Sequence, residues 1–157
     1  MSKTSHIHFV SVVLWAGVLA LILGLVLPDP SLAETTRYYD SQGRSAGSSR
    51  DSLDGSRTRH YDSHGRNIGS TRRDLDGRTR TYDGSGRLTG TSRPNSRGGA
   101  DYYNARGQRE GYSRPNSRGG YNYYDASGRL TGSSRANSRG GQDYYDASGR
   151  RQGSSRR

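Results

Sequence analysis

Hydrophobic residues are distributed unevenly along this chain of 157 residues. One continuous apolar run lies near the N-terminus, from Phe9 to Leu27, and only Ser11 interrupts it. Beyond residue 33, tyrosine and glycine recur at regular intervals among polar residues. The first pattern predicts one hydrophobic helix, whereas isolated apolar residues flanked by turn-forming residues predict short β-strands.

The N-terminal run has the features of a secretory signal peptide. Pro28 and Pro30 end it, and Ser31-Leu32-Ala33 places small residues where a signal peptidase reads. We therefore expect residues 1–33 to be a signal helix that is cleaved after Ala33, leaving an exported chain that is periplasmic, at the cell surface or secreted. A retained transmembrane anchor is the alternative, because a run of this length spans a bilayer. The absence of cysteine excludes a lipid-anchored lipoprotein.

Residues 34–157 consist of six tandem repeats, each recognised by one tyrosine that we call the anchor tyrosine. Successive anchors are 22 and then 21 residues apart. Periods of this length are typical of repeat architectures, in which neighbouring units stack to bury their apolar residues. The anchor tyrosines are Tyr39, Tyr61, Tyr82, Tyr103, Tyr124 and Tyr145. A turn glycine stands four positions after each anchor, at Gly43, Gly65, Gly86, Gly107, Gly128 and Gly149. An arginine stands eleven positions after each anchor, at Arg50, Arg72, Arg93, Arg114, Arg135 and Arg156.

Within one repeat the order of residues predicts a β-hairpin. The segment from Asp125 to Gly128 favours a type I turn that is closed by a glycine in the left-handed region. Such a turn places Leu130 opposite Tyr124, and a second glycine-terminated turn follows the strand. We therefore expect an all-β repeat fold of about a dozen short antiparallel strands. They would form a hairpin meander, arranged as an open single layer or a solenoid-like array.

The alternation of side chains along a strand assigns faces to the repeat positions. Tyr124, Leu130 and Gly132 are expected to share one face, with the tyrosine ring covering the glycine. The eleventh-position arginines are expected on the opposite face, where they would form a ladder of guanidinium groups. The arginines are therefore candidate ligand-binding residues, and the anchor tyrosines have a structural or ring-stacking role.

Two of the repeats resemble a known family. The segments from Tyr82 to Thr89 (YDGSGRLT) and from Tyr124 to Thr131 (YDASGRLT) are similar to the YD repeat of Rhs and teneurin-type proteins. The resemblance implies an extracellular or envelope-associated β-structure. The chain departs from the family in having only six units, in its Gly-x-Ser-Arg segment after the core and in keeping Leu in two copies. Six units are too few to enclose a cargo, so the resemblance implies an architecture and not a toxin-encapsulating role.

The composition supports a second reading, in which the mature chain is largely disordered. Only 27% of the residues are hydrophobic and none is cysteine, so neither a large core nor disulfide bonds can stabilise a fold. Low apolar content with a high net charge is typical of disordered chains. The fixed period favours the ordered β-repeat, and disorder is kept as the alternative.

The charge of the chain is strongly basic and is carried by arginine. The sequence has 25 Lys and Arg residues against 14 Asp and Glu, a net charge of +11, and Lys3 is its only lysine. Guanidinium groups form bidentate hydrogen bonds with phosphate, sulfate and carboxylate, and they also stack on aromatic rings. Because the acids can neutralise only some of the arginines, we expect an anionic glycan or another polyanion as partner. Pairing of the arginines with turn aspartates or tyrosines is the simpler alternative.

No combination of catalytic residues recurs in the repeats. His60 and His64 are the only histidines beyond the predicted signal and lack a third metal ligand, so we interpret both as surface substitutions. Gly119-Gly120 lacks the strand-loop-helix context of a phosphate-binding loop. We therefore expect no enzymatic activity, no cofactor and no metal.

These observations predict an exported, non-enzymatic repeat protein of the cell envelope or extracellular space. It would bind anionic polymer (polysaccharide, lipopolysaccharide or extracellular DNA) through a periodic arginine and tyrosine surface. One alternative is a structural protein that self-associates through unpaired sheet edges. Another is a carbohydrate-binding module that binds independently of salt. The membrane would be contacted only by an uncleaved signal segment.

Overall fold

The computed structural model describes residues 34–157. The predicted signal helix and its cleavage site lie outside the described residues, so both stay predictions. All regular secondary structure from residue 34 onward is β-strand. That range contains no helix with the length and hydrophobicity needed to cross a membrane.

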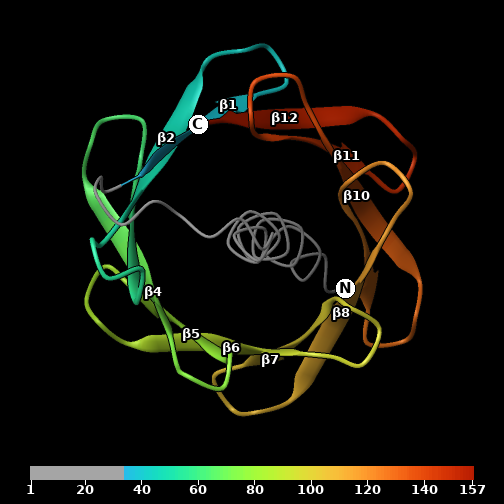
Figure 1. Cartoon of the computed structure of the whole chain (residues 1–157), viewed down its shortest axis with the longest axis horizontal. Helices are drawn as coiled ribbons and strands as arrows, with labels where there is room; N and C mark the ends of the chain where they lie inside the picture. Colours follow the sequence, from blue (N-terminus) through green and yellow to red (C-terminus); the bar gives the residue numbers. More distant parts are fainter. Residues whose placement is uncertain (1–33) are drawn as a thin grey trace, which may run out of the picture.

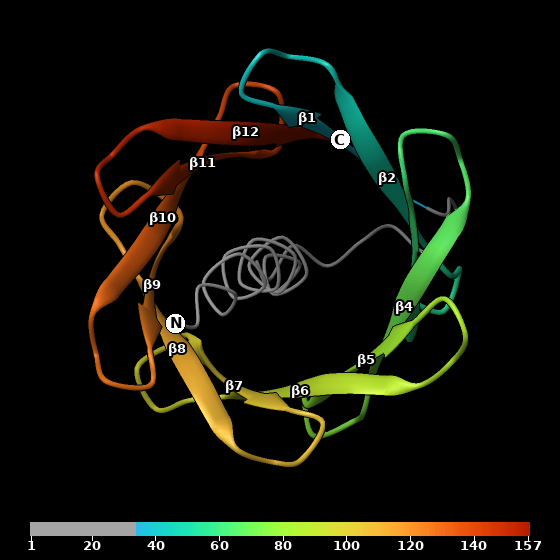
Figure 2. The same cartoon turned by 180° about the vertical axis from the view of Figure 1, so that it is seen from behind.

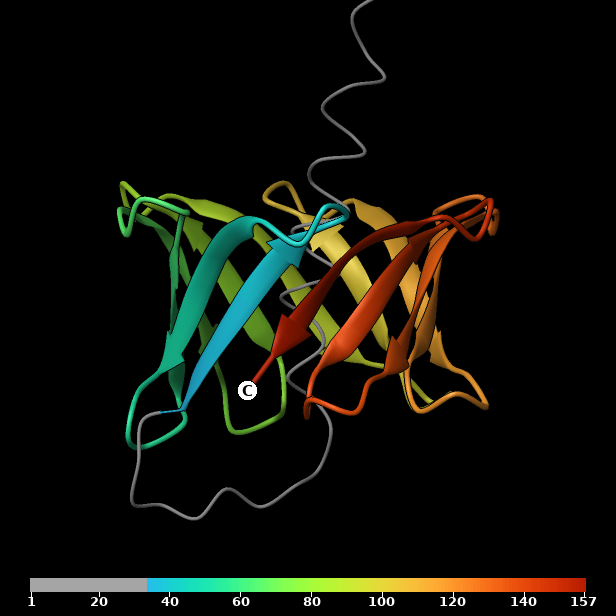
Figure 3. The same cartoon turned by 90° about the horizontal axis from the view of Figure 1, so that it is seen from above.

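Twelve antiparallel strands form one closed barrel (Figure 1). Successive strands of the chain are neighbours around the wall, which Figure 2 shows from behind. Figure 3 shows that the strands are tilted relative to the barrel axis, as closure of a sheet requires. The strands are β1 (Thr35–Asp40), β2 (Ser45–Asp51), β3 (Arg57–Tyr61), β4 (Asn67–Arg73), β5 (Thr79–Asp83), β6 (Leu88–Pro94), β7 (Ala100–Asn104), β8 (Arg109–Pro115), β9 (Tyr121–Asp125), β10 (Leu130–Ala136), β11 (Gln142–Asp146) and β12 (Arg151–Arg156).

The first and last strands pair with each other and close the barrel. β1 lies antiparallel to β12, with Arg37 opposite Arg156 and Tyr39 opposite Ser154. The predicted antiparallel meander of hairpins is confirmed, but the open or solenoid-like arrangement is wrong. Twist and tilt accumulate along the meander until β12 meets β1, and their pairing removes both sheet edges. Six repeats therefore suffice for closure, and the described chain is ordered rather than a disordered coil.

Each repeat forms one hairpin whose turn has the predicted geometry. In the fifth repeat, Gly128 N donates to Asp125 O at 3.0 Å, and Asp125 N donates to Arg129 O at 3.0 Å. Gly128 has a φ of 87°, in the left-handed region that glycine adopts without strain. Leu130 lies opposite Tyr124, as predicted. These hairpin turns form one rim of the barrel, and the turns that join successive hairpins form the other (Figure 3).

A β-bulge in every hairpin reverses the face assignment beyond the turn. In β10 the register shifts between Leu130 and Gly132, so that Thr131 is an extra residue without a partner. The same irregularity occurs in the other five hairpins. The extra residue changes the alternation by one, so Arg135 lies on the same face as Tyr124. The prediction that the eleventh-position arginines and the anchor tyrosines occupy opposite faces is therefore wrong.

The bulge also changes the reason for the recurrent glycine at the eighth position after the anchor. A Cβ atom at Gly132 would lie 2.6 Å from the carbonyl oxygen of Tyr145, which is closer than real Cβ contacts allow. The glycine is thus required by the backbone of the next repeat, and it does not share a face with the anchor ring of its own repeat. The same approach to an anchor carbonyl occurs at Gly47, Gly69, Gly90, Gly111 and Gly153.

The inward face of the barrel is lined by aromatic–hydroxyl pairs instead of aliphatic side chains. Tyr123, which precedes an anchor, is 8% exposed, and its hydroxyl lies 3.3 Å from Ser134 Oγ. Burial raises the pKa of such tyrosines, to about 12 at Tyr102. Equivalent pairs are Tyr38–Ser49 (2.9 Å), Tyr102–Ser113 (2.9 Å) and Tyr144–Ser155 (3.2 Å). Leu53, Leu75 and Leu130 are exposed, so the core depends on tyrosine and small hydroxyl residues.

Candidate functional site

The outer face of the barrel carries stacked arginine–tyrosine pairs. Each pair joins the eleventh-position arginine of one repeat to the anchor tyrosine of the next, on the neighbouring strand. The distances from the guanidinium carbon to the ring centroid are 5.7 Å for Arg72–Tyr82, 5.4 Å for Arg93–Tyr103, 5.5 Å for Arg114–Tyr124, 4.2 Å for Arg135–Tyr145 and 4.4 Å for Arg156–Tyr39. Attraction between a cation and the ring face favours one position of the guanidinium group. The last pair crosses the junction of β12 with β1, so the series continues around the closed wall.

Two positions depart from this regular pattern. Arg50 is exposed, and within residues 34–157 it forms no cation–π contact with Tyr61, the anchor tyrosine of the next repeat. Arg114 makes a second contact, at 5.0 Å from the ring of Tyr112, and that ring stacks on Tyr124 with centroids 4.8 Å apart. The eleventh-position arginines thus all lie on the outer face, but they differ in the number of tyrosine rings that each contacts.

In four repeats the arginine of the hairpin turn forms an ion pair with the turn aspartate. Arg129 Nε lies 2.9 Å from Asp125 Oδ2, and three other repeats have the same ion pair. Hydrogen bonds from the Ser127 hydroxyl, from backbone N–H groups and from Arg129 hold the pKa of Asp125 at about 2. These acids therefore pair with turn arginines at the rim of the barrel, and within the described chain they form no ion pair with the eleventh-position arginines.

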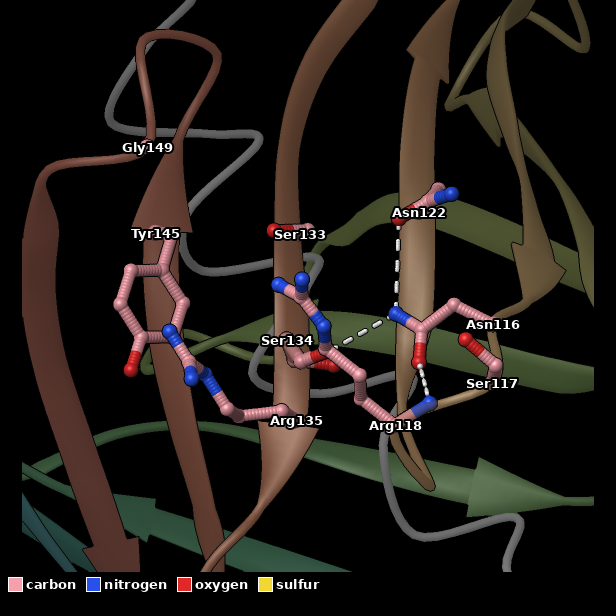
Figure 4. Close-up of a pocket in the computed structure, with 9 residues that line it drawn as sticks. All are labelled: Asn116, Ser117, Arg118, Asn122, Ser133, Ser134, Arg135, Tyr145 and Gly149. Atoms are coloured by element: carbon pink, nitrogen blue, oxygen red, sulfur yellow. Dashed lines mark hydrogen bonds between the residues drawn. The ribbon is translucent and has the colours of Figure 1, made fainter.

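A polar pocket of about 290 Å³ lies on the outer face, between the β8–β9 turn and β11 (Figure 4). Its walls are formed by Asn116 and Arg118 of the turn, Asn122 of β9, Arg135 of β10 and Tyr145 of β11. Asn116 Nδ2 donates to Ser134 O at 2.9 Å, and Asn116 Oδ1 accepts from Arg118 N at 2.9 Å. The first of these hydrogen bonds ties the turn to β10, and the second lies within the turn.

The pocket is positively charged, since two arginines and no carboxylate line it. Arg118 and Arg135 contribute the two charged side chains of the lining. Asn122 occupies the position at which the preceding and following repeats have Asp101 and Asp143. Guanidinium groups, side-chain amides and a serine hydroxyl can together donate hydrogen bonds to the oxygens of a sugar, carboxylate or sulfate group.

The two histidines occupy different environments. His60 lies on the inward face, is 4% exposed and has its Nε2 atom 3.0 Å from Thr71 Oγ1, so its interpretation as a surface substitution is wrong. His60 takes the place that tyrosine has in four other repeats, and burial lowers its pKa to about 4. His64 lies exposed in a hairpin turn, as the interpretation requires. Residues 34–157 contain no group of three or more acidic or histidine side chains that could hold a metal ion.

Two sets of residues were not singled out by the sequence analysis. The inward tyrosines form much of the core, and the Tyr-Tyr doublets before four of the turns are the signal that could have found them. The outward residue two positions before each anchor lies opposite an eleventh-position arginine, as at Arg59, Arg80 and Asp101. Along the chain this set changes from arginine in the first three repeats to an acid or amide in the last three. The change has structural meaning only because the cross-strand register places each of these residues opposite an arginine.

Comparison with protein-family models and with curated proteins finds no match for this chain. The similarity to the YD repeat therefore rests on the two short motifs and stays a prediction.

Proposed function

We propose that this chain is an exported, non-enzymatic repeat protein that binds anionic polymer through the outer arginine–tyrosine surface of the barrel. The proposal places it in the cell envelope or extracellular space, after removal of the signal segment. It requires no cofactor and no metal. The observation that carries it is the series of stacked pairs, in which five arginines that lack a carboxylate partner are each held over a tyrosine ring.

The stacking favours anion binding for a physical reason. An arginine normally loses side-chain entropy when it binds a ligand, and that loss reduces affinity. A guanidinium group that already rests on a ring loses less, while its N–H groups at the edge remain able to bind a carboxylate, sulfate or phosphate. Repetition of the pair around the wall suits a polymer, because several weak contacts then act together.

The two alternative functions have less support. Self-association through sheet edges requires an unpaired strand, and the strands of residues 34–157 each pair on both sides in the closed barrel. A salt-insensitive carbohydrate-binding module requires open aromatic rings. The anchor rings of five repeats instead carry an arginine at 4.2 to 5.7 Å.

Titration of the protein with polygalacturonate, sulfated dextran and neutral dextran tests the proposal. The two acidic polymers should bind, and affinity should fall by at least about tenfold between 50 and 200 mM salt, because binding releases counterions. Neutral dextran should not bind. Equal binding of neutral and acidic polymers, or affinity that does not depend on salt, would contradict the proposal and favour the carbohydrate-binding alternative.

A further inference from the structure

The six-fold pattern of the outer face is broken by one change of charge. The residue two positions before the anchor is Arg37, Arg59 and Arg80 in the first three repeats, whereas the last three have Asp101, Asn122 and Asp143. In the register of the barrel each of these residues lies opposite an eleventh-position arginine. The first three repeats therefore oppose arginine with arginine, and the last three oppose arginine with an acid or amide.

The arginine–arginine pairs lie next to one another because the barrel is closed. Arg37 of β1 lies opposite Arg156 of β12, across the junction of the first and last strands. Arg50 of β2 lies opposite Arg59 of β3, and Arg57 of β3 lies opposite Arg72 of β4. β12, β1 and β2 are neighbours in the wall (Figure 1), and Arg37 lies opposite Ser48, two residues from Arg50 of the same strand. The pairs therefore lie in one band across five strands. We call it the arginine band: Arg37, Arg50, Arg57, Arg59, Arg72 and Arg156.

The acids near the arginine band do not neutralise it. None of its six arginines forms an ion pair with a carboxylate of the described residues. Asp74 instead pairs with Arg80 at 2.9 Å, Glu34 pairs with Arg157 at 3.2 Å, and Asp51 accepts a hydrogen bond from Thr58 at 2.6 Å. On the other half of the wall, Asp101 and Asp143 pair with Arg109 and Arg151.

Like charges placed directly opposite one another destabilise a sheet, so the unbound barrel bears a cost in this sector. An anion that bridges two opposed guanidinium groups removes the repulsion and makes charge-assisted hydrogen bonds to both. From this we propose, building on the function proposed above, that the arginine band is the main binding site and that its ligand is a single flexible chain of acidic polysaccharide.

Shape and chemistry favour polysaccharide over nucleic acid. The band follows the convex outer wall across five strands, and a flexible chain can bend around it. Duplex DNA has a persistence length of about 50 nm and would touch a convex wall at only a few points. Single-stranded nucleic acid gains affinity by stacking its bases on aromatic rings. In this sector, Arg156 and Arg72 already lie 4.4 Å and 5.7 Å from the rings of Tyr39 and Tyr82, so among the described residues Tyr61 is the one anchor ring of the band without such an arginine. One such ring offers little stacking to a run of bases.

Two triple variants test the site. In the band variant, Arg50, Arg72 and Arg156 are changed to Ala, and in the matched control Arg93, Arg114 and Arg135 are changed to Ala. Both variants remove three charges from the same repeat position. Polygalacturonate affinity should fall by about tenfold or more in the band variant. The control removes arginines of the same periodic surface, so its affinity should also fall, but by a clearly smaller factor of about threefold. If the triple variant folds poorly, the double variant Arg37→Asp, Arg59→Asp takes its place. It introduces the acid that two of the last three repeats have at this position, and it should show the same loss of polygalacturonate affinity.

The outcomes separate the two proposals. Equal losses in both triple variants would overturn the arginine band and leave the periodic binding surface standing. Wild-type protein that binds neither acidic polymer would overturn both proposals. A third outcome is that single-stranded or duplex DNA of equal charge binds more tightly than polygalacturonate, and that the band variant loses this DNA binding. That result would support the site but overturn its assignment to polysaccharide.

Discussion

Arg135 and Tyr145 belong to different repeats, yet the guanidinium carbon of Arg135 lies 4.2 Å from the centroid of the Tyr145 ring. The contact exists because β10 and β11 pair across the turn that joins two hairpins, with Ser133 opposite Tyr145. Arg135, a candidate ligand-binding residue, therefore also links neighbouring repeats. The candidate site and the stability of the wall depend on the same side chains.

The coupling between Arg135 and Tyr145 can be measured with a double-mutant cycle. We expect Arg135→Ala and Tyr145→Leu to be coupled by about 0.5 to 1 kcal/mol in the free energy of unfolding, the range of an exposed cation–π contact. Urea denaturation of the four proteins measures it. The same cycle on Arg50 and Tyr61, a pair without this contact, is the control and should give no coupling. Similar coupling at both pairs would mean that stacking is not its source.

Gly132 should not tolerate a side chain. In Gly132→Ala the new methyl group would collide with the carbonyl oxygen of Tyr145, which belongs to rigid backbone in the adjacent strand. We expect a loss of about 2 kcal/mol or more in the free energy of unfolding. Ser133→Ala, at the next position and on the outer face, should change stability by less than about 0.5 kcal/mol. Thermal or urea unfolding monitored by circular dichroism compares the two, and equal effects would contradict the close approach.

His60 should make the barrel less stable in weak acid. Its pKa in the folded state is lowered to about 4 by burial, from an ordinary value of 6.5, so the unfolded chain binds the proton first as pH falls. Its contribution is fully present above pH 6.5 and is lost between pH 6.5 and about 4, by at most about 3 kcal/mol. Urea midpoints measured across this range test the effect.

His60→Tyr is the matched control for that experiment, because four other repeats have tyrosine at this position. The variant should lose the pH dependence between 6.5 and 4 while keeping the fold. Losses at lower pH would remain, since the turn carboxylates of Asp125 and Asp146 have pKa values of about 2. An unchanged pH profile in His60→Tyr would show that another group titrates.

Closure of the barrel predicts that cysteines placed in the first and last strands can form an intramolecular disulfide. Arg37 and Arg156 are direct partners in the β1–β12 ladder, and such partners lie within the Cα separation that a disulfide requires. The chain has no cysteine of its own, so the double variant Arg37→Cys, Arg156→Cys provides the only pair. On mild oxidation it should form a monomeric disulfide, seen as faster migration on a non-reducing gel. Arg37→Cys with Arg114→Cys, whose strands are not neighbours, should not. Disulfide-linked multimers in place of the monomer would indicate an open array.

The sequence alone determined the local structure of this protein. The order Asp-x-x-Gly, as in Asp125 to Gly128, specifies its own turn, because the glycine supplies the left-handed conformation and the aspartate accepts hydrogen bonds from the turn backbone. These interactions act within about five residues, so they can be read from composition and spacing. The number of strands, their antiparallel order and the pairing of Leu130 with Tyr124 follow from the same local signal.

The tertiary structure decided which residues meet beyond one hairpin. Because Thr131 is an extra residue in β10, Arg135 lies on the face of the anchor tyrosines. The alternation of polar and apolar residues in the sequence does not predict such a bulge. Closure brought Arg37 opposite Arg156, at the two ends of the described chain, and so created the arginine band. Twist and tilt accumulate over all twelve strands, and the contacts that they produce are therefore a property of the whole sheet.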